Sequence, residues 1–165
     1  MPPRTMLRVA TQMVLRDSEP TDHHELFTLF SDIVDEGEGF PEAPPLDEAR
    51  FKASWIDPPV VVVAEHGDAV IGAYYLKANF PGRAAHIANA GYMVAAKVRG
   101  MGVGRALVAD SILRAPQAGF DAIMFNLVFE SNPARALYEE LGWAPIGRIP
   151  RGVEGEPAII YWRDV

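Results

Sequence analysis

The sequence predicts a mixed α/β fold, in which a central sheet of six to seven strands is flanked by about four helices. Apolar runs rich in β-branched residues, joined by short turns, fill residues 60–95, and amphipathic helical patterns lie on both sides of them. A glycine-rich turn and a helical pattern then connect residues 85–95 to another apolar run at 121–128. A helix crossover makes two strands parallel, so the sheet is expected to be mixed.

Length and composition favour a single domain over residues 1–165, with residues 1–8 as a loose tail. Hydrophobic residues make up 49% and charged residues 22% of the chain, which is typical of globular proteins. The net charge of −7 argues against nucleic acid as the main partner, because phosphate binding needs clustered Lys and Arg. The longest aliphatic run, residues 60–64, is too short to span a membrane, so a cytoplasmic location without a membrane partner is expected.

The sequence contains no cysteine, which excludes disulfides, thiolate metal sites and cysteine nucleophiles. Its four histidines have no convincing partner in a metal-ligand pattern, so no metal is expected.

A strand and a helix are expected first. Residues 12–16 alternate weakly between apolar and polar side chains, which predicts a strand. A helix is expected to begin at Asp22, because Glu25 three residues later completes a capping box. The apolar stripe of this helix is formed by Leu26, Leu29, Phe30 and Ile33.

A loop and a short helix follow. Residues 35–45 are acidic and rich in glycine and proline, which predicts a loop. Residues 46–55 predict a second helix that carries Phe51 and Trp55 on one face.

Three antiparallel strands are expected next, over residues 60–65, 69–77 and 85–95. Short turns at 66–68 and 81–83 join them.

The second half of the chain predicts two helices and three strands. The first helix covers residues 103–115 and is expected to end at Pro116 and Gly119. The second begins with Asn132 as its N-cap and ends with Gly142 at C′. The three strands are expected over residues 121–128, 144–149 and 158–163.

The glycine-rich turn has the features of a phosphate site. Gly100, Gly102 and Gly104 stand between an apolar strand pattern and a helical pattern. Glycines let backbone N–H groups converge on an anion, and the new helix adds unpaired N–H groups and the positive end of its dipole. A diphosphate is therefore the expected ligand.

The spacing argues against two common nucleotide-binding motifs. A P-loop needs Gly-Lys-Ser/Thr, whereas Gly104 is followed by Arg105 and Ala106. A Rossmann G-x-G-x-x-G motif counted from Gly100 would place Arg105 where its last glycine belongs.

The remaining pattern, R-x-x-G-x-G at Arg99, Gly102 and Gly104, resembles the acyl-CoA pyrophosphate loop of the GNAT (Gcn5-related N-acetyltransferase) superfamily. Downstream, residues 126–143 are similar to the N-x-x-A-x-x-L-Y-x-x-x-G-F/W signature that the same superfamily carries. The two motifs and the upstream strand pattern extend the resemblance over roughly residues 10–164.

This resemblance implies a GNAT fold that binds acetyl-CoA as co-substrate where the fourth and fifth strands splay apart. The splay is expected near residues 90–92, where Gly91 inside a strand also indicates a β-bulge. A backbone N–H near Val94 is expected to polarise the thioester carbonyl. The expected cofactor-binding residues are Met93, Val94, Arg99, Gly100, Met101, Gly102, Val103, Gly104, Arg105, Asn132 and Arg135.

The resemblance also suggests catalytic residues. Tyr138 matches the family position of the acid that protonates the departing CoA thiolate, although a structural core tyrosine is the alternative. Many members place a glutamate on the fourth strand as general base, but residues 87–90 contain no carboxylate. Glu36, Glu38 and His86 are the candidates instead, with solvated or structural roles as their alternatives.

The function expected from the resemblance is acetyl transfer from acetyl-CoA to a primary amine of a small molecule or peptide, by direct attack in a ternary complex. The family also allows a homodimer. Two alternatives remain open. The missing glutamate on the fourth strand is compatible with a non-catalytic acyl-CoA-binding or sensing domain. A transferase acting on a macromolecule such as the ribosome is disfavoured by the acidic charge.

Overall fold

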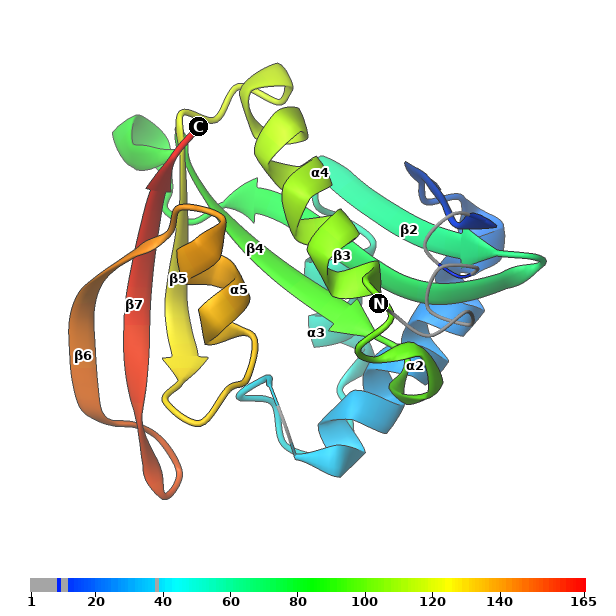
Figure 1. Cartoon of the computed structure of the whole chain (residues 1–165), viewed down its shortest axis with the longest axis horizontal. Coiled ribbons are helices and arrows are strands. Elements are labelled where there is room, and N and C mark those ends of the chain that lie inside the picture. The colour runs from blue at the N-terminus through cyan, green and yellow to red at the C-terminus, as the bar shows by residue number, and fades with distance from the viewer. Residues whose placement is uncertain (1–8, 10–11, 38) are drawn as a thin grey trace, which may run out of the picture.

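Seven strands form one mixed sheet in the computed structural model, which describes residue 9 and residues 12–37 and 39–165 (Figure 1). The strand order is β1-β2-β3-β4-β5-β7-β6. The strands are β1 (Val14–Asp17), β2 (Val60–His66), β3 (Ala69–Ala78), β4 (Ile87–Val94), β5 (Ala122–Phe129), β6 (Ala144–Val153) and β7 (Glu156–Asp164). Only β4 and β5 are parallel neighbours among these strands, and a helix joins them, as predicted.

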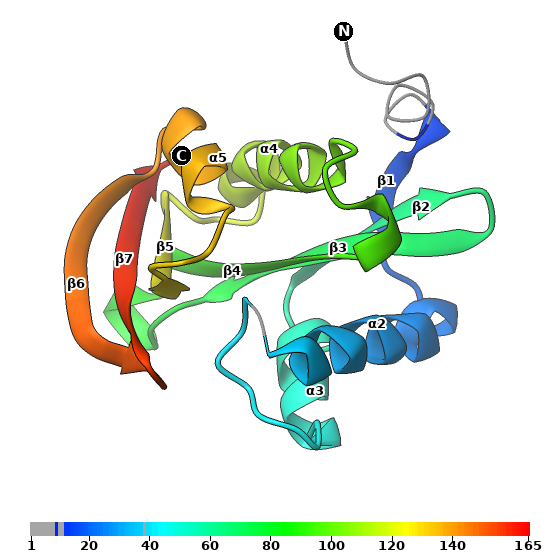
Figure 2. The same cartoon turned by 60° about the horizontal axis from the view of Figure 1, so that its bottom comes forward.

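Helices cover both faces of the sheet (Figure 2). They are α2 (His23–Glu36), α3 (Glu48–Trp55), α4 (Val103–Gln117) and α5 (Arg135–Glu140). Helices α2 and α3 pack on one face, and α4 and α5 pack on the other, which confirms the predicted mixed α/β architecture. Among the described residues, no helix combines the length and the apolar character that crossing a membrane requires.

Strand β3 shows why two cores form. Successive side chains of a strand point to opposite faces, and both faces of β3 are covered. Tyr74 therefore packs in the core under α4, whereas Tyr75 packs in the core under α2 and α3. Trp55 contacts Tyr75 edge-on, with ring centres 5.0 Å apart.

The splay between the fourth and fifth strands is present. Strands β4 and β5 pair only at Ile87 with Ala122 and at Ala88 with Ile123, and they separate beyond these residues. Figure 1 shows the two strands diverging from that end.

The bulge predicted in β4 is wrong. Strand β4 pairs with β3 in unbroken register from Ala88 to Val94. Gly91 instead makes room for the Tyr75 ring, since a Cβ at that position would lie 2.6 Å from Tyr75 Cε1. The irregularity lies in β5, where the register with β7 shifts between Phe125 and Val128.

The predicted capping box at the start of α2 is also wrong. Asp22 precedes the helix but makes no capping hydrogen bond to it. Its carboxylate accepts from both terminal nitrogens of Arg16, at 2.8 and 2.9 Å, and from the amide of Glu19 at 2.7 Å. Glu25 instead accepts from the amide of Val70. The sequence pattern did not show that tertiary partners would occupy both carboxylates.

Several predicted boundaries shift. Helix α2 continues through Asp35 and Glu36, which were expected in the loop, and ends at Gly37 with φ 73°. Strand β1 begins at Val14 rather than at residue 12. The expected loose tail at residues 1–8 lies outside the described residues.

Helix α4 runs through Pro116 to Gln117 instead of ending at residue 115. A proline in the last turn removes only one helical hydrogen bond. Gly119, with φ 88°, then turns the chain out of the helix.

The two ends of α5 differ in how well they were predicted. Asn132 is not the N-cap, because α5 begins only at Arg135; its side chain instead accepts from the amide of Ala134 at 2.9 Å in a local turn. Gly142 is at C′ with φ 97°, as predicted. The amides that follow the helix donate back to Glu139 and Tyr138, which is the Schellman pattern.

Candidate active site

A cleft of about 860 Å³ lies where β4 and β5 separate. Side chains from both faces of the sheet border it. From the face of α2 and α3 come Ile33, Phe40, Glu42 and Tyr75, and from the face of α4 and α5 come Val108, Leu137 and Tyr138. The separation of the strands therefore opens a passage between the two sides of the sheet.

The inner wall of this cleft offers unpaired backbone amides. Asn79 N donates to Ile87 O, and Ala95 N donates to Ile71 O. The backbone N–H and C=O groups of the odd-numbered residues of β4 therefore point toward β3. The amides of residues 90, 92 and 94 therefore point toward β5, which no longer pairs with β4 at this level. Met93 and Val94, both predicted cofactor-binding residues, line the cleft.

The glycine-rich turn lies at the start of α4. Gly100 and Gly102 have φ values of 76° and 87°, which only glycine adopts without strain. Gly102 is the N-cap, and the first helical bond runs from the amide of Ala106 to Gly102 O. The amides of residues 103–105 therefore have no acceptor in the helix, and they can receive an anion.

Arg99 and Gly104 border the cleft at this turn. A Cβ added at Gly104 would lie 3.7 Å from Val94 Cγ2, in ordinary contact, so this glycine is not required by the backbone of the free protein. Its small size instead keeps the mouth of the cleft open.

Two residues predicted for different roles contact each other. Arg99 donates to the carboxylate of Glu36 at 2.8 Å and to the carbonyl of Val94 at 3.3 Å. Both side chains of the ion pair are more than a third exposed, so the pair contributes little to stability. Glu36 is therefore bound to the start of the glycine-rich turn, and it is not among the described residues that line the cleft.

Two further predicted cofactor ligands are engaged elsewhere. Arg105 pairs with Glu140 of α5 at 2.6 Å. Arg135 donates to the hydroxyl of Tyr161 at 2.9 Å and to the carbonyl of Glu130 at 2.8 Å, which fastens the turn after β5 to β7. Neither side chain is among the described residues that border the cleft, whereas Asn132 is.

Tyr138 lies inside the cleft wall. Its side chain is 9% exposed and its ring packs 4.7 Å from that of Phe125 and 6.2 Å from that of Tyr92, measured between centres. Burial, and then the nearby Tyr161, raise the pKa of Tyr138 above its usual value of 10. The hydroxyl is therefore protonated at neutral pH and can act as a hydrogen-bond donor or acid.

Neither of the described base candidates, Glu36 and His86, borders the cleft. Glu38 lies outside the described residues, and His86, just before β4, does not border the cleft. Asn89 occupies the cleft side of β4; it accepts from the hydroxyl of Tyr75 at 3.2 Å and donates to Met124 O at 3.1 Å. Strand β4 therefore presents an amide where many family members are expected to present a carboxylate.

Sequence reasoning missed three acidic residues that border the cleft: Glu42, Glu154 and Glu156. Glu42 belongs to a stretch that resembles a solvated loop, Glu154 lies in the turn between β6 and β7, and Glu156 begins β7. No local pattern in the sequence singles out these three carboxylates, because their positions depend on tertiary packing.

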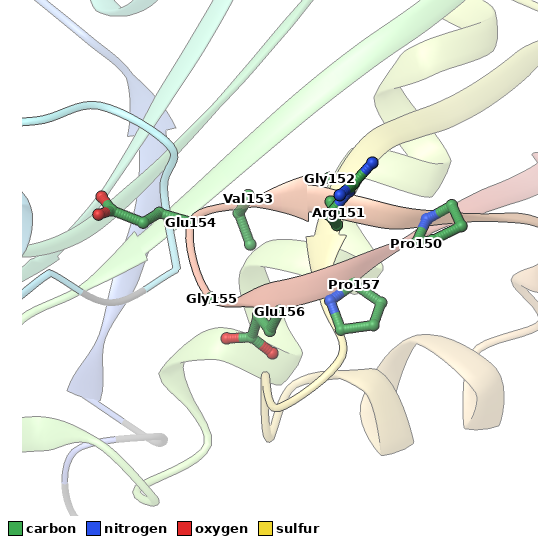
Figure 3. Close-up of a pocket in the computed structure, with 8 residues that line it drawn as sticks. All are labelled: Pro150, Arg151, Gly152, Val153, Glu154, Gly155, Glu156 and Pro157. Carbon is green, nitrogen blue, oxygen red and sulfur yellow. The ribbon is translucent and has the colours of Figure 1, made fainter.

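A second hollow of about 530 Å³ lies within the β6–β7 hairpin (Figure 3). A single run of the chain, residues 150–157, lines it, so no segment distant in the sequence brings functional groups to it. Figure 3 shows the guanidinium of Arg151 lying away from the carboxylates of Glu154 and Glu156. We therefore take the cleft between β4 and β5 as the candidate active site.

Comparison with known families gives one match that covers most of the fold. Residues 23–143 match the family model described as "Acetyltransferase (GNAT) family". The N-acetyltransferase aca1 of Schizosaccharomyces pombe is 40% identical over 82 residues, which are 49% of this chain and 39% of that protein. Protein SPT10 of Saccharomyces cerevisiae is 33% identical over 81 residues, which are 48% of this chain and 13% of that protein. The match thus spans well under half the length of these relatives.

Solved structures show the same fold. A GCN5-related N-acetyltransferase from Kribbella flavida superposes with a TM-score of 0.88 at 34% identity, covering 94% of this chain and 99% of that chain. A GNAT superfamily phosphinothricin acetyltransferase from Sinorhizobium meliloti, solved in complex with acetyl-CoA, has a TM-score of 0.80 at 23% identity, covering 93% and 89%. At that identity the second likeness concerns the fold alone.

Proposed function

Since the chain belongs to the acetyltransferase (GNAT) family, we propose that it transfers an acetyl group from acetyl-CoA to a primary amine of a small molecule or peptide. The observation that carries this proposal is the cleft at the β4–β5 splay, where unpaired strand amides and the open first turn of α4 border the same space. The strand amides are suited to bind a thioester carbonyl, and the first turn of α4 is suited to bind a diphosphate.

The residues present fit acetyl-CoA. The left-handed Gly100 and Gly102 orient the turn, and the open space around Gly100 leaves room for phosphate oxygens. The unpaired amide of Val94 is suited to stabilise negative charge on the thioester oxygen. Bound acetyl-CoA would supply an electrophilic carbonyl carbon and a thiolate leaving group.

The proposed reaction is a direct attack within a ternary complex. The acceptor ammonium first releases a proton to water and becomes a free amine. The amine nitrogen then bonds to the carbonyl carbon, the carbon–sulfur bond breaks, and the nitrogen releases a second proton to water. Tyr138 donates a proton to the departing thiolate and regains one from solvent. A covalent acyl-enzyme on cysteine is excluded because the chain has no cysteine.

The remaining parts of the proposal concern the whole chain. A single domain over residues 1–165 is supported by the one continuous sheet of the described residues, whose two faces are both covered by helices. A cytoplasmic location and a homodimer stay predictions.

The proposal is tested by measuring thiol release from acetyl-CoA with a panel of primary amines, together with calorimetric titration of acetyl-CoA. We expect saturable binding and amine-dependent release of CoA. Binding without release on any amine would contradict the transferase and favour the sensing domain.

The variant Gly104→Val tests the proposed diphosphate site. Its side chain would enter the mouth of the cleft, so binding of acetyl-CoA should be lost while the fold is retained. Unchanged binding would contradict the proposed diphosphate site.

A further inference from the structure

One carboxylate oxygen in the wall of the cleft is shielded from solvent without a partner. Glu42 lies between α2 and α3 and borders the cleft. Its Oε2 atom is buried, and no described residue donates a hydrogen bond to it. Burying a carboxylate oxygen without a donor is unfavourable, and buried polar atoms in native proteins are nearly always satisfied. The oxygen is therefore suited to a donor that arrives with a ligand.

The neighbours of Glu42 do not supply that donor. The hydroxyl of Tyr75 donates to Asn89 at 3.2 Å. Lys77 lies over the Tyr75 ring, with its ammonium 4.8 Å from the ring centre, and donates to Ser54 at 3.3 Å. Burial lowers the pKa of Lys77, and the nearby charge of Glu42 offsets only part of this effect. Lys77 is not among the described residues that border the cleft.

The charges that border the cleft are mostly negative. They are three carboxylates, Glu42, Glu154 and Glu156, and one guanidinium, Arg99, among the described residues. Glu156 accepts from the amide and the hydroxyl of Ser131, and Arg99 pairs with Glu36. Arg99 lies at the glycine-rich turn, so the carboxylates of Glu42 and Glu154 dominate the rest of the cleft and favour a cation there.

Glu42 also lies on the side from which an acceptor would approach. The open turn of α4 and Tyr138 belong to the face covered by α4 and α5. Glu42 follows α2, and the neighbouring Tyr75 packs in the core under α2 and α3. If acetyl-CoA occupies the first side, the amine must reach the thioester from the second.

We propose that Glu42 binds the ammonium group of the acceptor, and that the acceptor is an amine without a carboxylate or other anion beside the reactive nitrogen. This assignment rests on the proposed transferase function and names the chemical class of its acceptor. The ammonium supplies the donor that Oε2 lacks, in a charge-assisted hydrogen bond. An α-amino acid would bring its own carboxylate against Glu42 and Glu154.

The test compares amines with the amino acids that differ from them by one carboxylate: agmatine with arginine, tyramine with tyrosine, and putrescine with ornithine. Release of CoA is measured at saturating acetyl-CoA for the wild type, Glu42→Gln and Glu48→Gln. Glu48 is exposed at the start of α3 and does not border the cleft, so its variant removes the same charge elsewhere.

In the wild type, at least one amine should exceed its amino acid in kcat/KM by about tenfold or more. Glu42→Gln should lower kcat/KM for that amine about 10- to 100-fold, mainly through KM, as expected for losing a hydrogen bond between charged groups. Glu42→Gln should also lower the ratio of kcat/KM for the amine to kcat/KM for its amino acid, whereas Glu48→Gln should leave this ratio unchanged. Equal use of amino acids, or an unchanged preference in Glu42→Gln, would overturn the assignment.

Calorimetry separates a failure of this assignment from a failure of the transferase. Acetyl-CoA should bind Glu42→Gln as tightly as it binds the wild type, because the open turn of α4 and Tyr138 belong to the opposite face of the sheet. If no acceptor is acetylated, the transferase proposal fails, and agmatine, tyramine and putrescine are titrated into the CoA complex. Binding to the wild type that is lost in Glu42→Gln would support the carboxylate site, and equal binding or none would refute it.

Discussion

A single hydroxyl group connects the packing of the molecule to its proposed chemistry. Tyr138 keeps its ring against Phe125 and Trp143, so the side chain has one well-defined position. The same burial raises the pKa of its hydroxyl. A phenol whose pKa is raised loses its proton only at a higher pH than usual, so Tyr138 remains an acid throughout the neutral range.

Replacing Tyr138 with phenylalanine should lower kcat about 100-fold, in the range usual for loss of a general acid. The KM for acetyl-CoA should change little, because the ring remains. The ratio of wild-type to variant kcat should stay constant between about pH 6 and 9, since the hydroxyl remains protonated over that range. Steady-state kinetics across pH measure both quantities, and full activity in the variant would refute the role.

The element on which binding depends is the turn between β4 and α4. Gly100 and Gly102 hold left-handed backbone conformations there, and the amides that open α4 remain without acceptors. Gly67, in the turn between β2 and β3, has a similar φ of 64° but lies outside the cleft. The two turns therefore share one backbone requirement, and only one of them borders the proposed ligand.

Gly102→Ala and Gly67→Ala should each lower the free energy of unfolding by about 1–2 kcal/mol, the usual cost of a left-handed non-glycine residue. Only Gly102→Ala should also weaken acetyl-CoA binding, by about tenfold or more, because its turn no longer presents the amides correctly. Denaturant unfolding and calorimetry measure the two effects. Equal affinity in both variants would show that the turn does not bind the cofactor.

At the scale of the whole molecule, the sheet consists of two parts, β1 to β4 and β5 to β7, which are joined by a short parallel pairing. Strands β1 to β4 pair in order, β5 pairs with β7, and β7 pairs with β6, but β4 and β5 share only two residue pairs. Helix α4 crosses from the end of β4 to the start of β5. A ligand in the cleft would therefore contact both parts and add to the stability of the whole.

Hydrogen exchange tests this arrangement amide by amide. Without ligand, the amides of residues 90, 92 and 94 should exchange faster than those of residues 89, 91 and 93, which face β3. Acetyl-CoA should slow exchange at Val94 and at residues 103–105, while β1 and β2 change little. Protection spread evenly over the sheet, or none at these amides, would contradict the proposed position of the cofactor.

Much of the fold could be predicted from local patterns. The β-branched run at residues 60–65, the turns at Gly67 and Gly82, and the apolar stripe from Leu26 to Ile33 each depend on neighbours in the chain. The glycine spacing after β4 and the downstream signature together pointed to the family, and the resemblance implied the splay. Errors arose where a distant partner took over a local role, as Arg16 did with Asp22.

The amino-acid order alone was sufficient for the mixed sheet, the order of its elements and the glycine-rich turn, because periodicity and backbone conformational limits act over a few residues. The acidic part of the cleft wall could not be predicted in this way. Glu42, Glu154 and Asn89 are far apart in the chain and meet only because β4 and β5 diverge while the α2–α3 segment and the last hairpin pack around the gap. Which charges face an acceptor is thus set by long-range packing, to which no local pattern corresponds.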